Sequence, residues 1–216
     1  MSNIKNNFIE FTLDHEILKF GNFILNSGRS SPYFFNTGIC NDGHTLNMLA
    51  SYYCQLIVDS TVNYDFIFGP AYKGITLATS ISSILNANYK INKPYCFNRK
   101  ESKQHGEKGL FVGYSPKGTA IIIDDVISSG KSIIDSIQLL NDKDVEVTAI
   151  FVAFDRMEKS NKIGSNKRAS LEIKEKYGIE IFSLICLDDV LNYLNNNDKY
   201  KQHVKDMENY IDTYRR

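Results

Sequence analysis

The residues best suited to do chemistry lie in one segment, Ala120 to Ile133, which reads AIIIDDVISSGKSI. An apolar run leads into two adjacent acids, Asp124 and Asp125, and then into a loop of small hydroxyl residues and a glycine. Such a loop before a helix offers a phosphate backbone N–H groups, hydroxyls and the positive end of a helix dipole. Gly130 allows the backbone to approach the phosphate closely. The segment therefore predicts a phosphate site.

The same segment leaves several readings open. Lys131 stands in the first turn of the predicted helix, where the dipole disfavours a cation, so it indicates a bound anion unless it is a solvated surface lysine. A nucleoside triphosphatase loop would need glycine where Asp125 stands, which disfavours that class. The two acids could hold a metal or accept hydrogen bonds from the hydroxyls of a ribose. A ribose phosphate would satisfy the acids and the loop together.

The elements that must position this segment follow from the hydrophobic pattern. From Asp65 onward, short apolar runs alternate with helical patterns, which predicts a parallel sheet. Ligands of such sheets bind beyond the carboxyl ends of the strands. Runs that are apolar throughout are typical of central strands covered on both faces. The predicted strands are Phe66 to Phe68, Tyr95 to Phe97, Ala120 to Ile123, Ala149 to Phe154 and Ile181 to Leu187.

The N-terminal part predicts a small appendage on this core. Apolar residues at helical spacing predict helices over Ile4 to Phe11 and Leu46 to Ile57. Between them, Phe20 to Asn41 is rich in Phe, Tyr, Gly and Ser, which predicts short antiparallel strands joined by turns. The other predicted segments are a loop over Arg156 to Arg168, a helix from about Ala169 and a helix over Val204 to Tyr214.

Composition excludes several classes of function. The 216 residues include 25 basic and 25 acidic side chains, so no overall field favours nucleic acid or an anionic membrane. No run approaches the roughly 18 apolar residues of a membrane helix, and the N-terminus lacks the pattern of a secretory leader. The cysteines, at positions 40, 54, 96 and 186, form no CxxC pair, which favours reduced thiols over a zinc site. We expect a cytoplasmic globular protein.

Two acids followed by a small hydroxyl and glycine loop resemble the motif by which type I phosphoribosyltransferases bind phosphoribosyl pyrophosphate (PRPP). Further segments resemble orotate phosphoribosyltransferases of the bacterial and fungal type, and the similarity extends over nearly the whole chain. These segments are LNSGRSSPYFFNTG at Leu25 to Gly38, FGPAYKG at Phe68 to Gly74, YCFNRKESKQHGEKG at Tyr95 to Gly109 and FDR at Phe154 to Arg156.

The resemblance implies a single α/β domain over 1–216 with the type I phosphoribosyltransferase fold. In that fold a central, mostly parallel sheet is flanked by helices and forms the PRPP-binding core, here at about 60–190. A small N-terminal hood of short strands and a helix, at about 1–42, binds the base. The implied reaction is the magnesium-dependent transfer of ribose 5-phosphate from PRPP to orotate, which yields orotidine 5′-monophosphate and pyrophosphate in the biosynthesis of UMP.

The resemblance also implies roles for individual residues. Magnesium would be held mainly through PRPP, near Asp124 and Asp125, and the loop from Arg99 to Gly109 would close over the site of a neighbouring subunit in a homodimer. The implied catalytic residues are Lys73, Arg99, Lys103, His105 and Asp125. The implied PRPP contacts are Tyr72, Lys73, Arg99, Lys100, Lys103, His105, Asp124, Asp125, Val126, Ile127, Ser128, Ser129, Gly130, Lys131 and Ser132. The implied orotate contacts are Phe34, Phe35, Ser128 and Arg156.

Plainer interpretations stand beside these roles. The Arg99 to Gly109 segment could be a solvated charged turn, and adjacent phenylalanines are mostly core residues. One departure concerns Asn26, because the family usually has a lysine there that contacts PRPP, and Arg29 or Lys131 could compensate. A purine phosphoribosyltransferase and a regulatory protein that only binds PRPP are the competing functions. The phenylalanines and the basic loop disfavour the first, and the neutral charge disfavours the second.

Overall fold

The central sheet dominates the computed structural model, which describes residues 2–25, 28–103, 109–159 and 167–215. Within these residues the sheet has six strands in the order β5-β4-β3-β6-β7-β8, and only β5 runs antiparallel to its neighbour. The predicted mostly parallel sheet is therefore confirmed. The strands are β3 (Phe66–Gly69), β4 (Tyr95–Lys103), β5 (Gly109–Gly113), β6 (Thr119–Ile127), β7 (Glu146–Asp155) and β8 (Glu180–Cys186).

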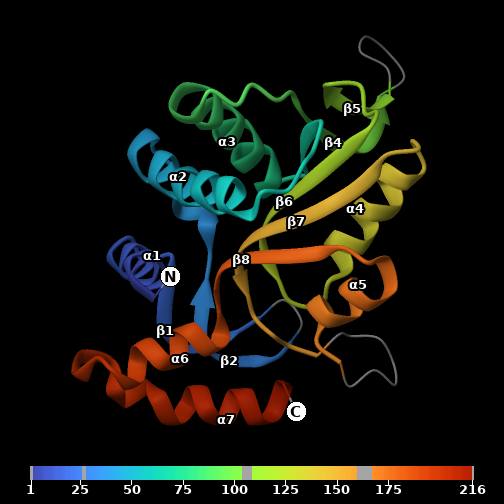
Figure 1. Ribbon diagram of the computed structural model, residues 1–216. Helices are drawn as coiled ribbons and strands as arrows, with labels where there is room; N and C mark the ends of the chain where they lie inside the picture. The colour runs from blue at the N-terminus through green and yellow to red at the C-terminus, as the bar shows by residue number, and fades with distance from the viewer. Residues whose placement is uncertain (1, 26–27, 104–108, 160–166, 216) are drawn as a thin grey trace.

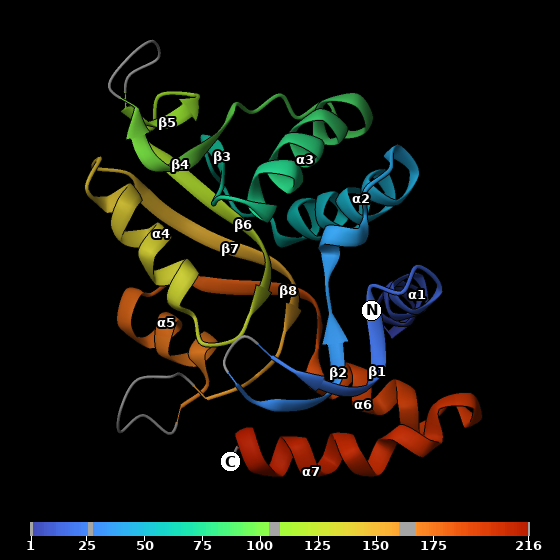
Figure 2. The same ribbon diagram turned by 180° about the vertical axis from the view of Figure 1, so that it is seen from behind.

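Strand β6 shows why both faces of the sheet are covered. Successive side chains of a strand point to opposite faces, so Ile121 and Ile123 join one hydrophobic cluster and Ile122 joins the other. Helices α2 and α3 cover the first face, and α4 and α5 cover the second (Figures 1 and 2). These helices are α2 (Gly43–Ser60), α3 (Lys73–Tyr89), α4 (Lys131–Asn141) and α5 (Ala169–Tyr177).

The appendage contains both ends of the chain. Strands β1 and β2 form an antiparallel pair beside α1, as the sequence predicts. The C-terminal helices lie along the same unit (Figures 1 and 2), where Phe20 stacks on His203 and Tyr33 packs against Tyr210. The elements are α1 (Ser2–Asp14), β1 (Leu18–Ile24), β2 (Ser30–Phe35), η1 (Thr37–Ile39), α6 (Leu187–Asn195), η2 (Asp198–His203) and α7 (Val204–Tyr214).

The structure departs from the predicted elements in several places. Strand β6 continues past Ile123 through both acids to Ile127, and the short helices η1 and η2 are unpredicted. The charged segment after Tyr95 is not one open loop, because β4 extends to Lys103 and pairs there with Gly109 at the start of β5. Helix α6 is unpredicted, because the apolar run of β8 continues into it without a glycine or proline. Asp189 begins this helix by accepting a hydrogen bond from the Cys186 N–H at 2.8 Å. None of the described helices is both long and apolar enough to span a membrane.

Candidate active site

The acid pair lies near the carboxyl end of β6, where neighbouring elements meet it. Asp124 and Asp125 are only 8% and 9% exposed. Lys73 Nζ lies 2.6 Å from Asp125 Oδ2, and the hydroxyl of Thr37 donates to the same oxygen at 3.1 Å. The hydroxyl of Ser132 donates to Asp124 Oδ2 at 3.2 Å. Side chains from β6, α3, α4 and η1 therefore converge at one edge of the sheet.

The surroundings of Asp124 change the ease with which its carboxyl group ionises. Burial, followed by the nearby charge of Asp125, raises the pKa of Asp124 to about 7. Hydrogen bonds from the Asp125 N–H and from Ser132, together with the charge of Lys73, oppose that rise in pKa. A ligand that brings hydroxyl donors or positive charge to Asp124 would favour its ionised form.

Gly130 shapes the loop between β6 and α4. Its φ of 78° lies in the left-handed region, and α4 begins directly after it at Lys131. The loop serines and Ser132 are at least partly exposed, whereas the side chain of Ile127 is buried in the core. Ile127 can therefore meet a ligand only through its backbone. The loop presents N–H groups, hydroxyls and a helix N-terminus to the solvent side of the site.

The turn after β3 brings Lys73 to the acids because two glycines allow close packing. A Cβ on Gly69 would lie 2.1 Å from the carbonyl oxygen of Gly74. A Cβ on Gly74 would lie 2.9 Å from the carbonyl oxygen of Ile123 in β6. Larger residues at either position would push the turn away from β6 and so separate Lys73 from Asp125.

Strand β4 adds cations beside this turn. The side chain of Asn98 accepts a hydrogen bond from the Ala71 N–H at 3.0 Å, which ties the strand to the turn. The ammonium of Lys100 lies 4.5 Å from the centre of the exposed Tyr72 ring. Arg99 donates to the carbonyl of Gly109 at 3.2 Å. Lys103 is the last residue of β4, and only its backbone is described. His105 lies outside the described residues.

The predicted base-binding residues differ in their surroundings. Phe34 is 38% exposed and stacks on Phe23, with ring centres 5.5 Å apart. Phe35 is buried, and its ring centre lies 5.0 Å from that of Phe154. Successive side chains of β2 point to opposite faces. Only Phe34 presents part of its surface to solvent.

Arg156 is buried just after β7, beside the end of β6. Its N–H donates to the carbonyl of Ile127 at 3.1 Å. Its guanidinium contacts Glu158 and Tyr210 and lies over the ring of Tyr33. The sequence interpretation missed Glu158, Tyr210 and Thr37, since nothing local in the sequence predicts which residues long-range contacts will bring to the site.

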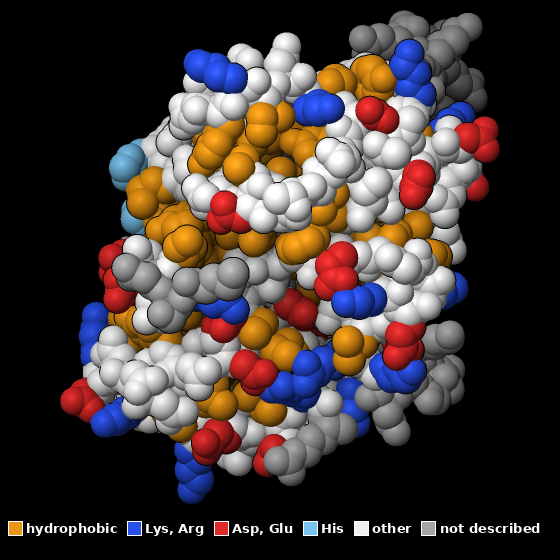
Figure 3. All heavy atoms as spheres, in the orientation of Figure 1, with side chains coloured by type: hydrophobic (Ala, Val, Ile, Leu, Met, Phe, Trp, Pro, Cys, Tyr) orange, Lys and Arg blue, Asp and Glu red, His pale blue; other side chains and the backbone are white. Residues whose placement is uncertain are grey.

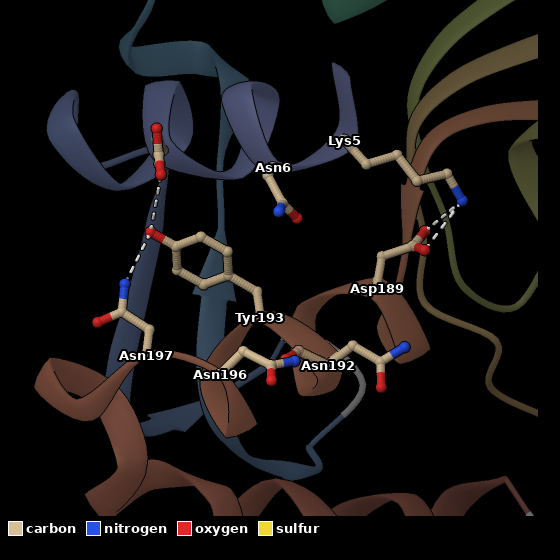
Figure 4. Close-up of a pocket in the computed structure, with 8 residues that line it drawn as sticks. Lys5, Asn6, Asp189, Asn192, Tyr193, Asn196 and Asn197 are labelled. Atoms are coloured by element: carbon tan, nitrogen blue, oxygen red, sulfur yellow. Dashed lines mark hydrogen bonds and ion pairs between the residues drawn. The ribbon is translucent and has the colours of Figure 1, made fainter. Parts of the chain in front are cut away.

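Two hollows within the described part of the chain lie away from the predicted site residues. One, of about 450 Å³, lies between α1 and α6, where Lys5 faces Asp189 and the hydroxyl of Tyr193 meets Asn197 (Figure 4). Another, of about 700 Å³, lies beside β5 and the end of α4. On the face in Figure 3, acidic and basic side chains are interspersed and hydrophobic ones gather over α2 and α3.

Comparisons with known proteins agree with this geometry. Residues 50–186 match the phosphoribosyl transferase domain family. The chain is 40% identical over 214 residues to an orotate phosphoribosyltransferase of Actinobacillus pleuropneumoniae, with 99% of each chain covered. It is 41% identical over 210 residues to one of Haemophilus influenzae, with 97% of each covered. It is also similar to the crystal structure of the Francisella tularensis orotate phosphoribosyltransferase, with a TM-score of 0.85, 38% identity and coverage of 96% of this chain and 98% of that one.

These similarities extend over nearly the full length of the chain. They confirm the fold and the family that the sequence motifs predict. The chain therefore belongs to the orotate phosphoribosyltransferase family.

Proposed function

We propose that the chain carries out the reaction of its family at the carboxyl edge of the sheet, transferring ribose 5-phosphate from PRPP to orotate. The observation that carries this location is the contact of 2.6 Å between Lys73 Nζ and Asp125 Oδ2. It brings together an acid suited to a ribose hydroxyl and a cation suited to a phosphate, directly before the phosphate loop. PRPP combines these groups in one molecule.

The acid pair and the loop would bind the ribose and its 5′-phosphate. Asp124 and Asp125 accept hydrogen bonds from the two ribose hydroxyls, which replace the donors that the acids now have. The 5′-phosphate takes the backbone N–H groups of Val126 to Ser132 and the loop hydroxyls. Charge-assisted hydrogen bonds of this kind are short and strong. The ribose is thereby held with its anomeric carbon facing the hood.

The cations around the turn after β3 would bind the pyrophosphate. The bond from the anomeric carbon to the pyrophosphate oxygen breaks through a transition state resembling an oxocarbenium ion, and negative charge builds on the leaving group. Lys73 and the β4 cations Arg99 and Lys100 stabilise that charge, and we assign the same role to Lys103 and His105. Fixed charges aimed at a developing charge are often the largest contribution to catalysis.

Orotate is a flat anion and would lie between the hood and the phosphate loop. The exposed ring of Phe34 provides a stacking face, Arg156 provides positive charge, and Ser128 provides a hydrogen bond. Phe35 serves this site through packing against Phe154 instead. A ring nitrogen of orotate then forms the new bond to the anomeric carbon, opposite the departing pyrophosphate.

The residues present fit a magnesium ion that is bound mainly through PRPP. Within the described residues there is no cluster of three or more His, Cys, Asp or Glu side chains that could form a complete metal site. Magnesium commonly takes one or two carboxylates together with substrate phosphates and water. Asp124 and Asp125 could supply those carboxylates. When bound with PRPP, magnesium would supply positive charge to the pyrophosphate.

We further propose a cytoplasmic homodimer in which the segment from Arg99 to Gly109 reaches the neighbouring site. The arms β4 and β5 extend beyond the rest of the sheet (Figures 1 and 2), and hydrophobic side chains over α2 and α3 offer a surface for a second copy (Figure 3). Mixing inactive Lys103→Ala and Asp125→Asn proteins tests the sharing. Recovery of activity on mixing supports a shared site, and continued inactivity contradicts it.

The experiment that tests the reaction follows orotate absorbance after the protein is mixed with orotate, PRPP and magnesium. We expect a loss of orotate that requires PRPP and that Lys73→Ala slows about 100-fold, as for removal of one charge-stabilising group. Lys90→Ala, at an exposed lysine just after α3, is the matched control and should keep full activity. Absence of orotate loss, or an equal rate with adenine, hypoxanthine or uracil, would contradict the proposal.

A further inference from the structure

We infer that Glu158 and Tyr210 are positioning residues that orient Arg156 toward the base, so that the C-terminal helix α7 is part of the base site. The inference rests on the proposed function, which gives Arg156 its role with orotate. It adds two residues that no motif in the sequence indicates. The contacts of the Arg156 side chain carry the argument.

The position of Arg156 is fixed first through its backbone. The residue follows β7 directly, and its N–H donates to Ile127 at 3.1 Å, so its Cα lies beside the phosphate loop. From there the side chain is buried among hood and C-terminal elements and is only 9% exposed. A long side chain that is ordered in this way has lost most of its rotamer freedom.

Three contacts determine where the guanidinium points. Nη2 donates to the hydroxyl of Tyr210 at 2.9 Å. Nε lies 2.7 Å from Glu158 Oε1, as an ion pair whose angle does not make it a hydrogen bond. The guanidinium carbon lies 4.9 Å from the centre of the Tyr33 ring. Since a guanidinium is a planar fork of donors, these contacts fix its plane, and we assign the remaining nitrogen, Nη1, to the ligand.

Glu158 and Tyr210 also bind each other. The Tyr210 hydroxyl donates a hydrogen bond to Glu158 and accepts one from Arg156, so it bridges these two side chains. Burial raises the pKa of Tyr210 to about 12, so the phenol keeps the proton that it donates. Glu158 is only 4% exposed and also accepts a hydrogen bond from Arg29 at 2.9 Å. One buried carboxylate thus holds an arginine at the end of β7 and another in the hood.

Loss of the Tyr210 hydroxyl would remove the hydrogen bond that Nη2 of Arg156 donates and one of the hydrogen bonds that Glu158 accepts, and the guanidinium could then turn. A hydrogen bond to a charged group contributes about 1.5–3 kcal/mol, which corresponds to roughly a tenfold or greater change in an equilibrium constant. PRPP does not contact this network in the proposed arrangement. The effect should therefore fall on orotate.

The test is Tyr210→Phe, which keeps the ring packing against Tyr33 and Tyr214 and removes only the hydroxyl. We expect the KM for orotate to rise about tenfold and the KM for PRPP to change by less than about twofold. Tyr214→Phe, one turn later in α7 with its ring against Arg29, is the matched control and should leave both constants unchanged. Glu158→Gln should act in the same direction as Tyr210→Phe.

A double-mutant cycle separates positioning from a structural role. If Tyr210 acts through Arg156, Tyr210→Phe should have almost no further effect on kcat/KM for orotate in an Arg156→Ala protein. Independent, additive effects would overturn the inference, and so would an equal rise in both KM values of Tyr210→Phe. Failure of the proposed function can be told apart from failure of this inference, because the unmodified protein would then show no PRPP-dependent loss of orotate.

Discussion

A Cβ atom on Gly130 would lie 3.2 Å from the Cβ of Ala169, which places the loop between β6 and α4 directly against the first residue of α5. Ile173, one turn further along α5, would be equally close to that added atom. The loop is therefore supported from behind by a helix that belongs to a later part of the chain. Its shape depends on the packing of α5 as well as on the left-handed backbone of Gly130.

The first prediction concerns Gly130→Ala. The substitution combines a left-handed φ of 78° with crowding against α5, whereas Gly178→Ala meets a φ of 71° with open space around it. Gly178→Ala should lower the free energy of unfolding by about 1 kcal/mol, and Gly130→Ala should lower it further and raise the KM for PRPP. Chemical unfolding and initial rates measure both effects. Equal stability of the two variants would contradict the role of the crowding.

The second prediction concerns the pH dependence of stability through Asp124. Its pKa rises from 3.8 to about 7 on folding, so between these values the unfolded chain binds fewer protons than the folded protein. The contribution of Asp124 to the free energy of unfolding must therefore fall as pH rises from about 4 to about 7. Asp124→Asn does not titrate and should gain stability relative to the unmodified protein over that range, by at most about 4 kcal/mol.

Urea unfolding at a series of pH values measures this difference. Asp135→Asn, at an exposed position of α4, is the matched control and should show a nearly constant difference. If the difference for Asp124→Asn were also independent of pH, the raised pKa of Asp124 would be refuted.

The parts of this site that could be predicted from the sequence are those whose residues lie close together along the chain. The acids, the loop and α4 lie in one continuous segment, so the hydrophobic run and the residue types predicted them together. The bridge between Arg156 and Tyr210 joins residues 54 positions apart, and no periodicity specifies which tyrosine of an amphipathic helix will reach which arginine. The sequence could not tell which of Phe34 and Phe35 is buried and which is exposed, because that depends on which face of β2 packs on Phe154.

The third prediction concerns the lysine that is absent at position 26, which lies outside the described residues. Of the proposed substitutes, Arg29 contacts Glu158 and lies over the ring of Tyr214, so it belongs to the Arg156 network. Lys131 is exposed at the start of α4, beside the proposed phosphate site. Lys131→Ala should raise the KM for PRPP severalfold and leave that for orotate unchanged. An unchanged KM for PRPP would refute the proposal that Lys131 takes the place of the missing lysine. Lys143→Ala, at an exposed lysine just beyond α4, is the control and should leave the KM for PRPP unchanged.

The fourth prediction separates binding from packing at the two phenylalanines of β2. Phe35 is buried against Phe154, so Phe35→Ala should lower the free energy of unfolding by about 3–5 kcal/mol, as large-to-small core substitutions do. Phe34 is 38% exposed, so Phe34→Ala should change stability much less and raise the KM for orotate. Thermal unfolding and orotate kinetics on the same preparations make the comparison. A normal KM for orotate in Phe34→Ala would remove the stacking face from the proposed site, because Phe35 is only 7% exposed and cannot replace it.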